Sequence, residues 1–361
     1  MKWCFIFLYL FSCAWADEKE EAWIVKEEFL SVDREDFDCH SSSIVETLPG
    51  HLCAVWKGGP GKGESNHSIS ENVGIWASLY DGKGWSIPEE IVSVPHSVTW
   101  TPILCKLSSE ELLLFYRTGP DPRRQVSFVK RSHDFGESWS EEEILPAGIA
   151  GPKGKPLLLS DGSLLCPSSI EVGEPEDLFK ATACWIEISE DNGMHWKKVG
   201  PLELPHRKFG GIEPVLFIDS DGHLRMLCRD RAHRIGEVGY IWEAISVDGG
   251  LHWSDFERTS LPNPDSGIDA VDLGGGKIVL FYNHSHTDRF PLHCAISCDG
   301  GNHWSAPIVL DSAGEFPAAT ATSDGLIHLT YSTKWPQREQ RGIKHLVINA
   351  ELLQSVPESN G

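Results

Sequence analysis

Positive charge is scarce in this chain, which has 31 Lys and Arg against 53 Asp and Glu over 361 residues. The net charge of −22 argues against nucleic acid and anionic membranes as partners. No Cys-x-x-Cys pair and no His-x-x-x-His cluster occurs, so neither a metal nor another cofactor is predicted. Sustained helical periodicity is also absent, which favours an all-β fold.

Long apolar runs are equally rare. One run, WCFIFLYLFSCAWA, follows Lys2 and ends in the small-x-small site Ala14-Trp15-Ala16 before the charged stretch DEKEE. This pattern predicts a signal peptide at 1–16, and hence a secreted or periplasmic protein. No second run approaches membrane-spanning length, so no membrane insertion is expected. We expect one domain over 17–353 and a polar C-terminal tail at 354–361.

A motif of eight residues, Ser-x-Asp-x-Gly-x-x-Trp, recurs through the chain. Four copies begin at Ser132, Ser189, Ser246 and Ser297, and a worn copy, SLYDGKGW, begins at Ser78. The copies start 54, 57, 57 and 51 residues apart. Such a regular period indicates a repeat architecture.

The number of predicted β-hairpins indicates how many repeats the chain contains. Asp-Gly or Gly-Gly turns, or similar short turns, precede apolar alternation in six places. Their residue ranges are 48–56, 107–116, 159–166, 219–228, 273–282 and 322–331. With an inner strand added before each hairpin, the modules predict a six-bladed β-propeller of four-stranded antiparallel blades. We expect 22–30 to pair near 342–349 and close the ring, which makes a monomer the expected state.

The repeated motif is predicted to be structural. Its Gly takes the tight turn, its Asp accepts backbone N–H bonds, and its Trp covers the hairpin against its neighbour. Because the same Asp occurs in several blades, we assign it no catalytic role.

Inner strands of a propeller line a central channel, and their starts meet the ends of the second strands at one mouth. Glu213 begins one inner strand and Arg229 ends the adjacent strand, so both should face this mouth. Polar groups converging at one concave place favour a ligand site. The candidate catalytic residues are Glu64, Glu213, Asp269, His284 and Glu315. The candidate substrate-binding residues are His40, Trp100, Arg117, Lys155, Arg229, Arg231 and Arg289.

The repeats resemble the Asp boxes of the sialidase (neuraminidase) superfamily of Asp-box (BNR) repeat proteins, and six modules match its six-bladed propeller. The resemblance covers the whole chain after the predicted signal peptide. Stretches such as LPNPDSGIDAV and SDGLIHLTY look like secreted proteins described as predicted neuraminidases. The resemblance implies three arginines on a substrate carboxylate, a Tyr nucleophile activated by a Glu, and an Asp acid/base. By position, Glu213 matches the assisting Glu, and Arg229 and Arg289 match the second and third arginines.

Three positions depart from that pattern. His40 stands where the first arginine is expected. Asn72 occupies the position of the acid/base Asp, with Glu71 and Glu64 nearby. Phe316 stands where the Tyr nucleophile is expected, and a phenyl ring cannot attack a sugar.

The departures leave three functions open. The first is a glycoside hydrolase for terminal acidic sugars of a glycoconjugate, in which Glu213 with Glu315, or Glu64 with Asp269, supplies two carboxylates. The second is a polysaccharide lyase or other uronate-cleaving enzyme with His284 or His40 as its base. The third is a non-catalytic sugar-binding propeller. The sugar, its linkage, the stereochemical course and the pairing of the cysteines are not determined by the sequence.

Overall fold

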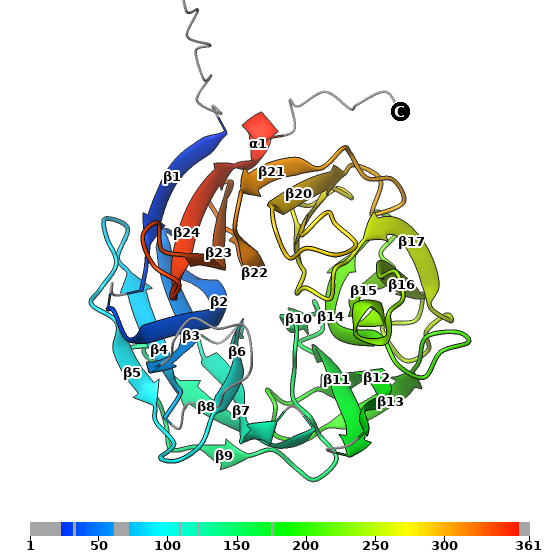
Figure 1. Cartoon of the computed structure of the whole chain (residues 1–361), viewed down its shortest axis with the longest axis horizontal. Helices are drawn as coiled ribbons and strands as arrows, with labels where there is room; N and C mark the ends of the chain where they lie inside the picture. The colour runs from blue at the N-terminus through cyan, green and yellow to red at the C-terminus, as the bar shows by residue number, and fades with distance from the viewer. Residues whose placement is uncertain are drawn as a thin grey trace, which may run out of the picture.

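Six β-sheets surround a common axis and form a closed ring (Figure 1). The computed structural model describes residues 23–31, 34–60, 72–107, 110–121, 123–174 and 177–353. Each sheet has four strands, and neighbouring strands are antiparallel. The predicted six-bladed β-propeller is therefore confirmed. The predicted signal peptide, the polar tail and Glu64 lie outside the described residues.

The first three blades follow one another along the chain, each running from the inner strand outward. Blade 1 contains β2 (Phe37–Leu48), β3 (His51–Pro60), β4 (Gly74–Tyr80) and β5 (Glu89–Val92). Blade 2 contains β6 (Thr99–Lys106), β7 (Leu112–Asp121), β8 (Arg124–Ser132) and β9 (Glu143–Ile144). Blade 3 contains β10 (Leu157–Leu158), β11 (Leu164–Glu174), β12 (Asp177–Ser189) and β13 (Lys197–Leu202).

Two further blades repeat this order, and the last one differs. Blade 4 contains β14 (Gly211–Ile218), β15 (Leu224–Asp230), β16 (Tyr240–Ser246) and β17 (Glu257–Pro262). Blade 5 contains β18 (Asp269–Asp272), β19 (Ile278–Tyr282), β20 (Leu292–Ser297) and β21 (Ile308–Asp311). Blade 6 contains β22 (Glu315–Ala321), β23 (Leu326–Lys334), β24 (Arg341–Asn349) and β1 (Ile24–Phe29).

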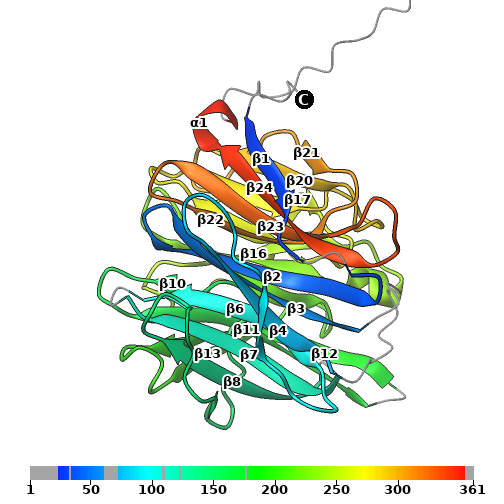
Figure 2. The same ribbon diagram turned by 90° about the vertical axis from the view of Figure 1, so that its left-hand side faces the viewer.

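The first described strand closes the ring. β1 pairs with β24, placing Phe29 opposite Lys344 and Glu27 opposite Leu346. Figure 2 shows the two strands side by side. The predicted pairing of 22–30 with 342–349 is thus confirmed. Because this pairing joins the two ends of the propeller, the last sheet is completed by the start of the chain.

Hydrophobic clusters join each blade to its neighbours. Between blades 4 and 5, for example, Phe217 and Leu227 pack with Leu280 and the ring of Tyr282, and all four are at most 1% exposed. The motif tryptophan Trp304 packs against the same cluster. Burial of these aromatic and aliphatic side chains holds neighbouring sheets face to face.

The eight-residue motif forms the same hydrogen-bonded turn in four blades. In the copy that begins at Ser189, the hydroxyl donates to Asp191 Oδ1 at 2.9 Å and accepts the Gly193 N–H at 2.8 Å. Asp191 Oδ1 also accepts the N–H of His195 at 2.8 Å. Gly193 has a φ of 84°, which favours glycine, and Trp196 stacks edge-on against Phe115 of the preceding blade. The contacts support the structural role predicted for the motif.

Replacing Ser189 by alanine is expected to lower the free energy of unfolding by about 1–2 kcal/mol, because the buried Gly193 N–H loses its acceptor. Urea unfolding would measure the change. The control is His195→Ala, which removes an exposed ring paired only with Asp191 and should change stability by less than about 0.5 kcal/mol. Equal effects of the two substitutions would contradict this account of the turn.

Helical structure is limited to η1 (Ala232–Ile235) and α1 (Ala350–Leu353) within the described ranges. In these ranges, no helix has the length and apolar character needed to cross a bilayer.

Candidate functional site

Four inner strands carry a bulge near their first residues, at the same end of the ring. The register shifts lie after His40 in β2, Trp100 in β6, Ile212 in β14 and Glu315 in β22. The residues Ser41, Thr101, Glu213 and Phe316 in these bulges have φ values of 53°, 24°, 49° and 53°. Positive φ is uncommon for residues other than glycine, and bulges redirect side chains near functional sites. This end of the propeller is therefore the candidate site.

Charged side chains of alternating sign from five blades meet at this end. We call this set the charged ring. Its members are Asp38, Lys153, Glu171, Glu213, Arg229, Arg231, Arg234, Asp265, Arg289, Glu315 and Arg341. Six cations and five anions are thus gathered in one place, although the whole chain carries a net charge of −22. The local excess of positive charge favours an anionic ligand.

Asp265 binds four arginines of the charged ring. Its Oδ1 lies 2.7 Å from Arg229 Nη2 and 3.2 Å from Arg231 Nε. Its Oδ2 lies 2.7 Å from Arg234 Nε and 3.3 Å from Arg289 Nη2. Although burial alone raises the pKa of Asp265, these guanidinium groups hold it well below its usual range. Asp265 therefore stays ionised and fixes the arginines in place.

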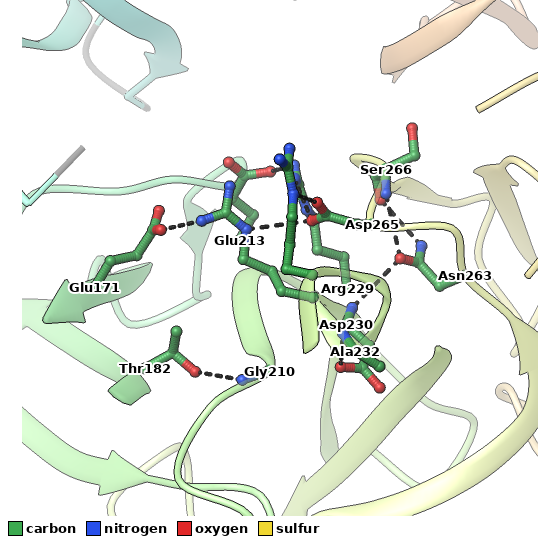
Figure 3. A network of polar contacts seen from close by, with 12 residues as sticks. Glu171, Thr182, Gly210, Glu213, Arg229, Asp230, Ala232, Asn263, Asp265 and Ser266 are labelled. Atoms are coloured by element: carbon green, nitrogen blue, oxygen red, sulfur yellow. Dashed lines mark hydrogen bonds and ion pairs between the residues drawn. The ribbon is translucent and has the colours of Figure 1, made fainter. Parts of the chain in front are cut away.

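Glu213 pairs with Arg229 on the neighbouring strand (Figure 3), and the two residues lie at the same end of the propeller. Arg231 forms an ion pair with Glu171, and Lys153 lies 3.8 Å from the same carboxylate. Burial raises the pKa of Glu213, but the charges of Arg229, Lys153 and Arg231 lower it further than burial raises it. Glu213 is consequently ionised at neutral pH.

Glu315 lies between two further arginines. Its Oε1 is 3.2 Å from Arg341 Nη1, and its Oε2 is 3.8 Å from Arg289 Nη1. Arg341 also holds Asp38 at 2.6 Å. The pKa of Glu315 would rise on burial, but the hydrogen bond from His40 and the charges of Arg341 and Arg289 lower it to about 2.

Phe316 occupies the centre of these groups. Its ring centroid lies 5.3 Å from the guanidinium carbons of both Arg229 and Arg289, and 4.4 Å from the His40 ring. The ring also packs against Gly267, where an added Cβ would lie 2.8 Å from Phe316 Cδ1. Gly267 thus leaves the space that the phenyl ring fills.

His40 uses both ring nitrogens within the site. Its Nδ1 lies 2.6 Å from Ser41 Oγ, and its Nε2 lies 3.5 Å from Glu315 Oε1. Burial, together with the charge of Arg341, lowers the pKa of His40 to about 3. The imidazole is therefore neutral at neutral pH and links the inner strands of blades 1 and 6.

Acid is expected to destabilise the fold through His40. The unfolded chain binds a proton at the ordinary pKa of 6.5, whereas the folded chain does so only near 3, so stability falls as pH drops from 6.5 toward 3. Protonation of Glu315 lowers the stability further only below pH 4.5, which is the ordinary pKa of a glutamate. His40→Asn should therefore show a smaller fall in urea midpoint between pH 6.5 and 5 than wild type. His51→Asn, which changes an exposed histidine at a hairpin turn, is the control for loss of a histidine, and an unchanged dependence in His40→Asn would contradict this role.

Two predicted residues lie deeper along the axis. Lys155 Nζ donates to the Ala319 carbonyl oxygen and lies 3.3 Å from Asp269 Oδ2. The same Asp269 oxygen accepts the Ala319 N–H at 2.7 Å, and Oδ1 accepts the Ala270 N–H at 2.9 Å. These contacts tie the inner strands of three blades together, which favours a structural role for both residues.

Three more predicted residues surround the site without joining the charged ring. Arg117 donates to the carbonyl oxygens of 150, 151 and 152, and so supports the turn before Lys153. Trp100 donates to Gly119 O at 2.8 Å, and its ring lies 5.2 Å from Lys57 Nζ. His284 is exposed, follows the end of β19, and bonds to Tyr282 Oη at 2.6 Å.

Six members of the charged ring were not predicted as site residues: Asp38, Lys153, Glu171, Arg234, Asp265 and Arg341. Lys153 precedes an inner strand together with Lys155, and the sequence does not show which of the two side chains faces the mouth. Asp265 lies in the connection before β18. Arg341 opens the third strand of blade 6, a position that the sequence analysis left aside in favour of inner strands and the ends of second strands.

A small cavity of about 50 Å³ lies beneath the charged ring. Its lining includes Ser42, Lys153, Glu213, Asp269 and Phe316. A larger groove of about 630 Å³ lies over blade 6, between Trp335, which stacks on Phe29 at 3.9 Å, and Lys344. The groove contains none of the predicted site residues.

One group of side chains has the spacing of metal ligands among the described residues: Asp219, Asp221 and His223, in the turn before β15. Asp219 already accepts the N–H groups of Asp221 and His223, at 3.0 and 2.9 Å, and pairs with Arg225 at 3.0 Å. Since a guanidinium group competes with a cation there, the arrangement fits a closed hairpin turn.

Comparison with known proteins agrees with this geometry. A family model described as a BNR repeat-like domain matches residues 50–329. A protein of unknown function from Dyadobacter fermentans is 18% identical with a TM-score of 0.74, and the alignment covers 90% of this chain and 98% of that one. A Hadza microbial sialidase is 17% identical with a TM-score of 0.69, and the alignment covers 87% of this chain and 66% of that one. The intramolecular trans-sialidase of Ruminococcus gnavus is 14% identical with a TM-score of 0.68, and the alignment covers 88% of this chain and 96% of that one. No curated protein sequence matches this chain significantly.

Proposed function

Since the chain belongs to the family of BNR repeat-like domains, we propose that it is an exported glycoside hydrolase for terminal acidic sugars of the sialic acid class. The predicted signal peptide at 1–16 supports export. The neighbouring structures that are sialidases support the substrate class, although at 14–17% identity they share only the fold.

One observation carries the proposal: Arg229, Arg289 and Arg341 converge from blades 4, 5 and 6 around Phe316 and Glu315. Arg289 and Arg341 are 31% and 19% exposed, so both can reach a ligand. Each guanidinium has five N–H donors, and its protein partners use only some of them. Fixed arginines of this kind recognise a carboxylate by charge and by paired hydrogen bonds.

Arg341 supplies a guanidinium group close to the position where the sequence has His40 in place of an arginine. The first arginine of the sialidase pattern is replaced by neutral His40, and the guanidinium of Arg341 lies beside His40 across Glu315. Its pKa is raised because, although burial lowers it, the carboxylates of Asp38 and Glu315 stabilise the charge. We therefore assign Arg341 as the third carboxylate-binding arginine.

The two histidines named as bases for the lyase alternative, both within the part of the chain that the structure describes, already have hydrogen-bond or ion-pair partners. Both nitrogens of His40 have partners, and the Nδ1 of His284 bonds to Tyr282 Oη. Glu213 and Glu315 remain as ionised carboxylates near Phe316, and these are the groups that hydrolysis of a glycoside uses.

Hydrolysis of 4-methylumbelliferyl α-N-acetylneuraminide, compared with its methyl ester, tests the proposal. We expect the acid to be hydrolysed and the ester to react at least about a hundredfold more slowly, since the ester lacks the charge that the arginines bind. Release of fluorescent 4-methylumbelliferone gives the rate. Binding of the acid without any release would instead indicate a sugar-binding protein, and equal rates would contradict the role of the arginines.

A further inference from the structure

A tyrosine nucleophile is missing from the site. Of the six tyrosines, Tyr9 lies outside the described residues. The other five make their contacts elsewhere: Tyr116 with Glu142, Tyr282 with His284, Tyr331 with Asp311, Tyr80 with Trp85 and Tyr240 with His286. None of these contacts is with the charged ring. Among the described residues, the charged ring therefore offers no tyrosine on which a covalent glycosyl intermediate could form.

The two carboxylates nearest Phe316 are poor nucleophiles for an acidic sugar. Glu315 is enclosed by Arg341, Arg289 and His40, which hold its charge. Glu213 is ionised and bound by Arg229. Attack by either anion on a sugar that carries a carboxylate would bring like charges together, whereas attack by neutral water would not.

Water has room next to Glu213. The cavity of about 50 Å³ beneath the charged ring exceeds the roughly 10–15 Å³ needed for one water molecule. Glu213, Lys153 and Ser42 supply polar groups along its wall. The Ser42 hydroxyl is buried and has no hydrogen-bond partner among the described residues, which makes it a ready site for a bridging water.

We propose that this site cleaves its glycoside by a single displacement with inversion, in which Glu213 acts as general base on water. The inference rests on the proposed function. The water oxygen bonds to the anomeric carbon as the glycosidic C–O bond breaks, and Glu213 takes a proton from the water. The electron pair departs with the aglycone oxygen, which for 4-methylumbelliferone leaves as the phenolate and is protonated by solvent. Glu213 then returns its proton to solvent.

The stereochemistry of the first product tests the inference. The purified protein is mixed with 4-methylumbelliferyl α-N-acetylneuraminide, and ¹H NMR follows the sugar before its anomers equilibrate. We expect the β-anomer first. Initial release of the α-anomer would overturn the single displacement while leaving the proposed function intact. Absence of any release would overturn the proposed function, and this inference with it.

Phe316→Tyr provides a matched test, because it adds only a hydroxyl beside Glu213. A 2,3-difluorinated sialic acid, which traps covalent glycosyl-enzymes, should label this variant and leave the wild type unmodified by intact mass spectrometry. The same variant should release the α-anomer first, since two displacements restore the original configuration. A covalent adduct on the wild-type protein would overturn the inference.

Discussion

Arg229→Ala is expected to lower kcat/KM for an acidic glycoside by about a hundredfold to a thousandfold. Arg229 is 2% exposed and bonds both Glu213 and Asp265. Removal of one partner from a buried, hydrogen-bonded charge pair costs about 2–5 kcal/mol, and each 1.4 kcal/mol is a factor of ten. The substitution also removes one of the three guanidinium groups proposed to bind the carboxylate. Initial rates of 4-methylumbelliferone release over a range of substrate concentrations would give the ratio.

Arg258→Ala is the matched control for that experiment. Arg258 lies on β17 of the same blade, is exposed, and stacks on Tyr240 with its guanidinium carbon 4.5 Å from the ring centroid. Its loss should leave kcat/KM within about twofold, because it has no contact with the charged ring. Circular dichroism would show whether Arg229→Ala is folded. A folded Arg229→Ala protein with wild-type kcat/KM would contradict the assigned site.

Glu213→Gln is expected to lower kcat by about a hundredfold to ten-thousandfold and to change KM little. The amide keeps the shape of the side chain but cannot take a proton from water, and a positioned general base contributes about 10²–10⁴ in rate. Substrate binding should persist because Arg289 and Arg341 do not contact Glu213, and the oxygen of the introduced amide can still accept the hydrogen bond from Arg229. Separate determination of kcat and KM with the methylumbelliferyl substrate would distinguish lost chemistry from lost binding.

The corresponding control is Glu243→Gln on β16 of the same blade. Glu243 also pairs with an arginine, since its Oε1 lies 3.1 Å from Arg225 Nη1, but that pair is away from the charged ring. Its kcat should match that of the wild type. If Glu213→Gln retained full kcat, another group would have to be the base, and the single displacement assigned to Glu213 would be wrong.

The repeated motif made the fold predictable. Its Ser, Asp, Gly and Trp form one hydrogen-bonded turn through contacts within eight residues, as the copy at Ser189 shows. Apolar alternation after each hairpin turn similarly fixes which face of a strand is buried. The order of six sheets follows from such local patterns, whereas closure of the last sheet pairs residues 24–29 with residues 344–348 at the other end of the chain.

Part of the site could be predicted for the same reason. Glu213 and Arg229 belong to one hairpin, so the predicted topology placed them at the same end, and the structure joins them in an ion pair. Lys155 and Asp269 were placed near the axis on similar grounds. The sequence could not show that their charges pair with each other, and with the Ala319 backbone, below the mouth.

The sequence alone therefore determined the number of blades, their strand order and the inner-strand positions that reach the axis, because each depends on residues close together in the chain. Only the tertiary structure decided how the charged ring is connected. Arg341 meets Asp38, 303 residues away, and Asp265 binds arginines from two separate segments, 229–234 and 289. Closure of the ring creates these contacts between residues that are far apart in the chain. Local sequence patterns cannot predict which of these residues will be in contact.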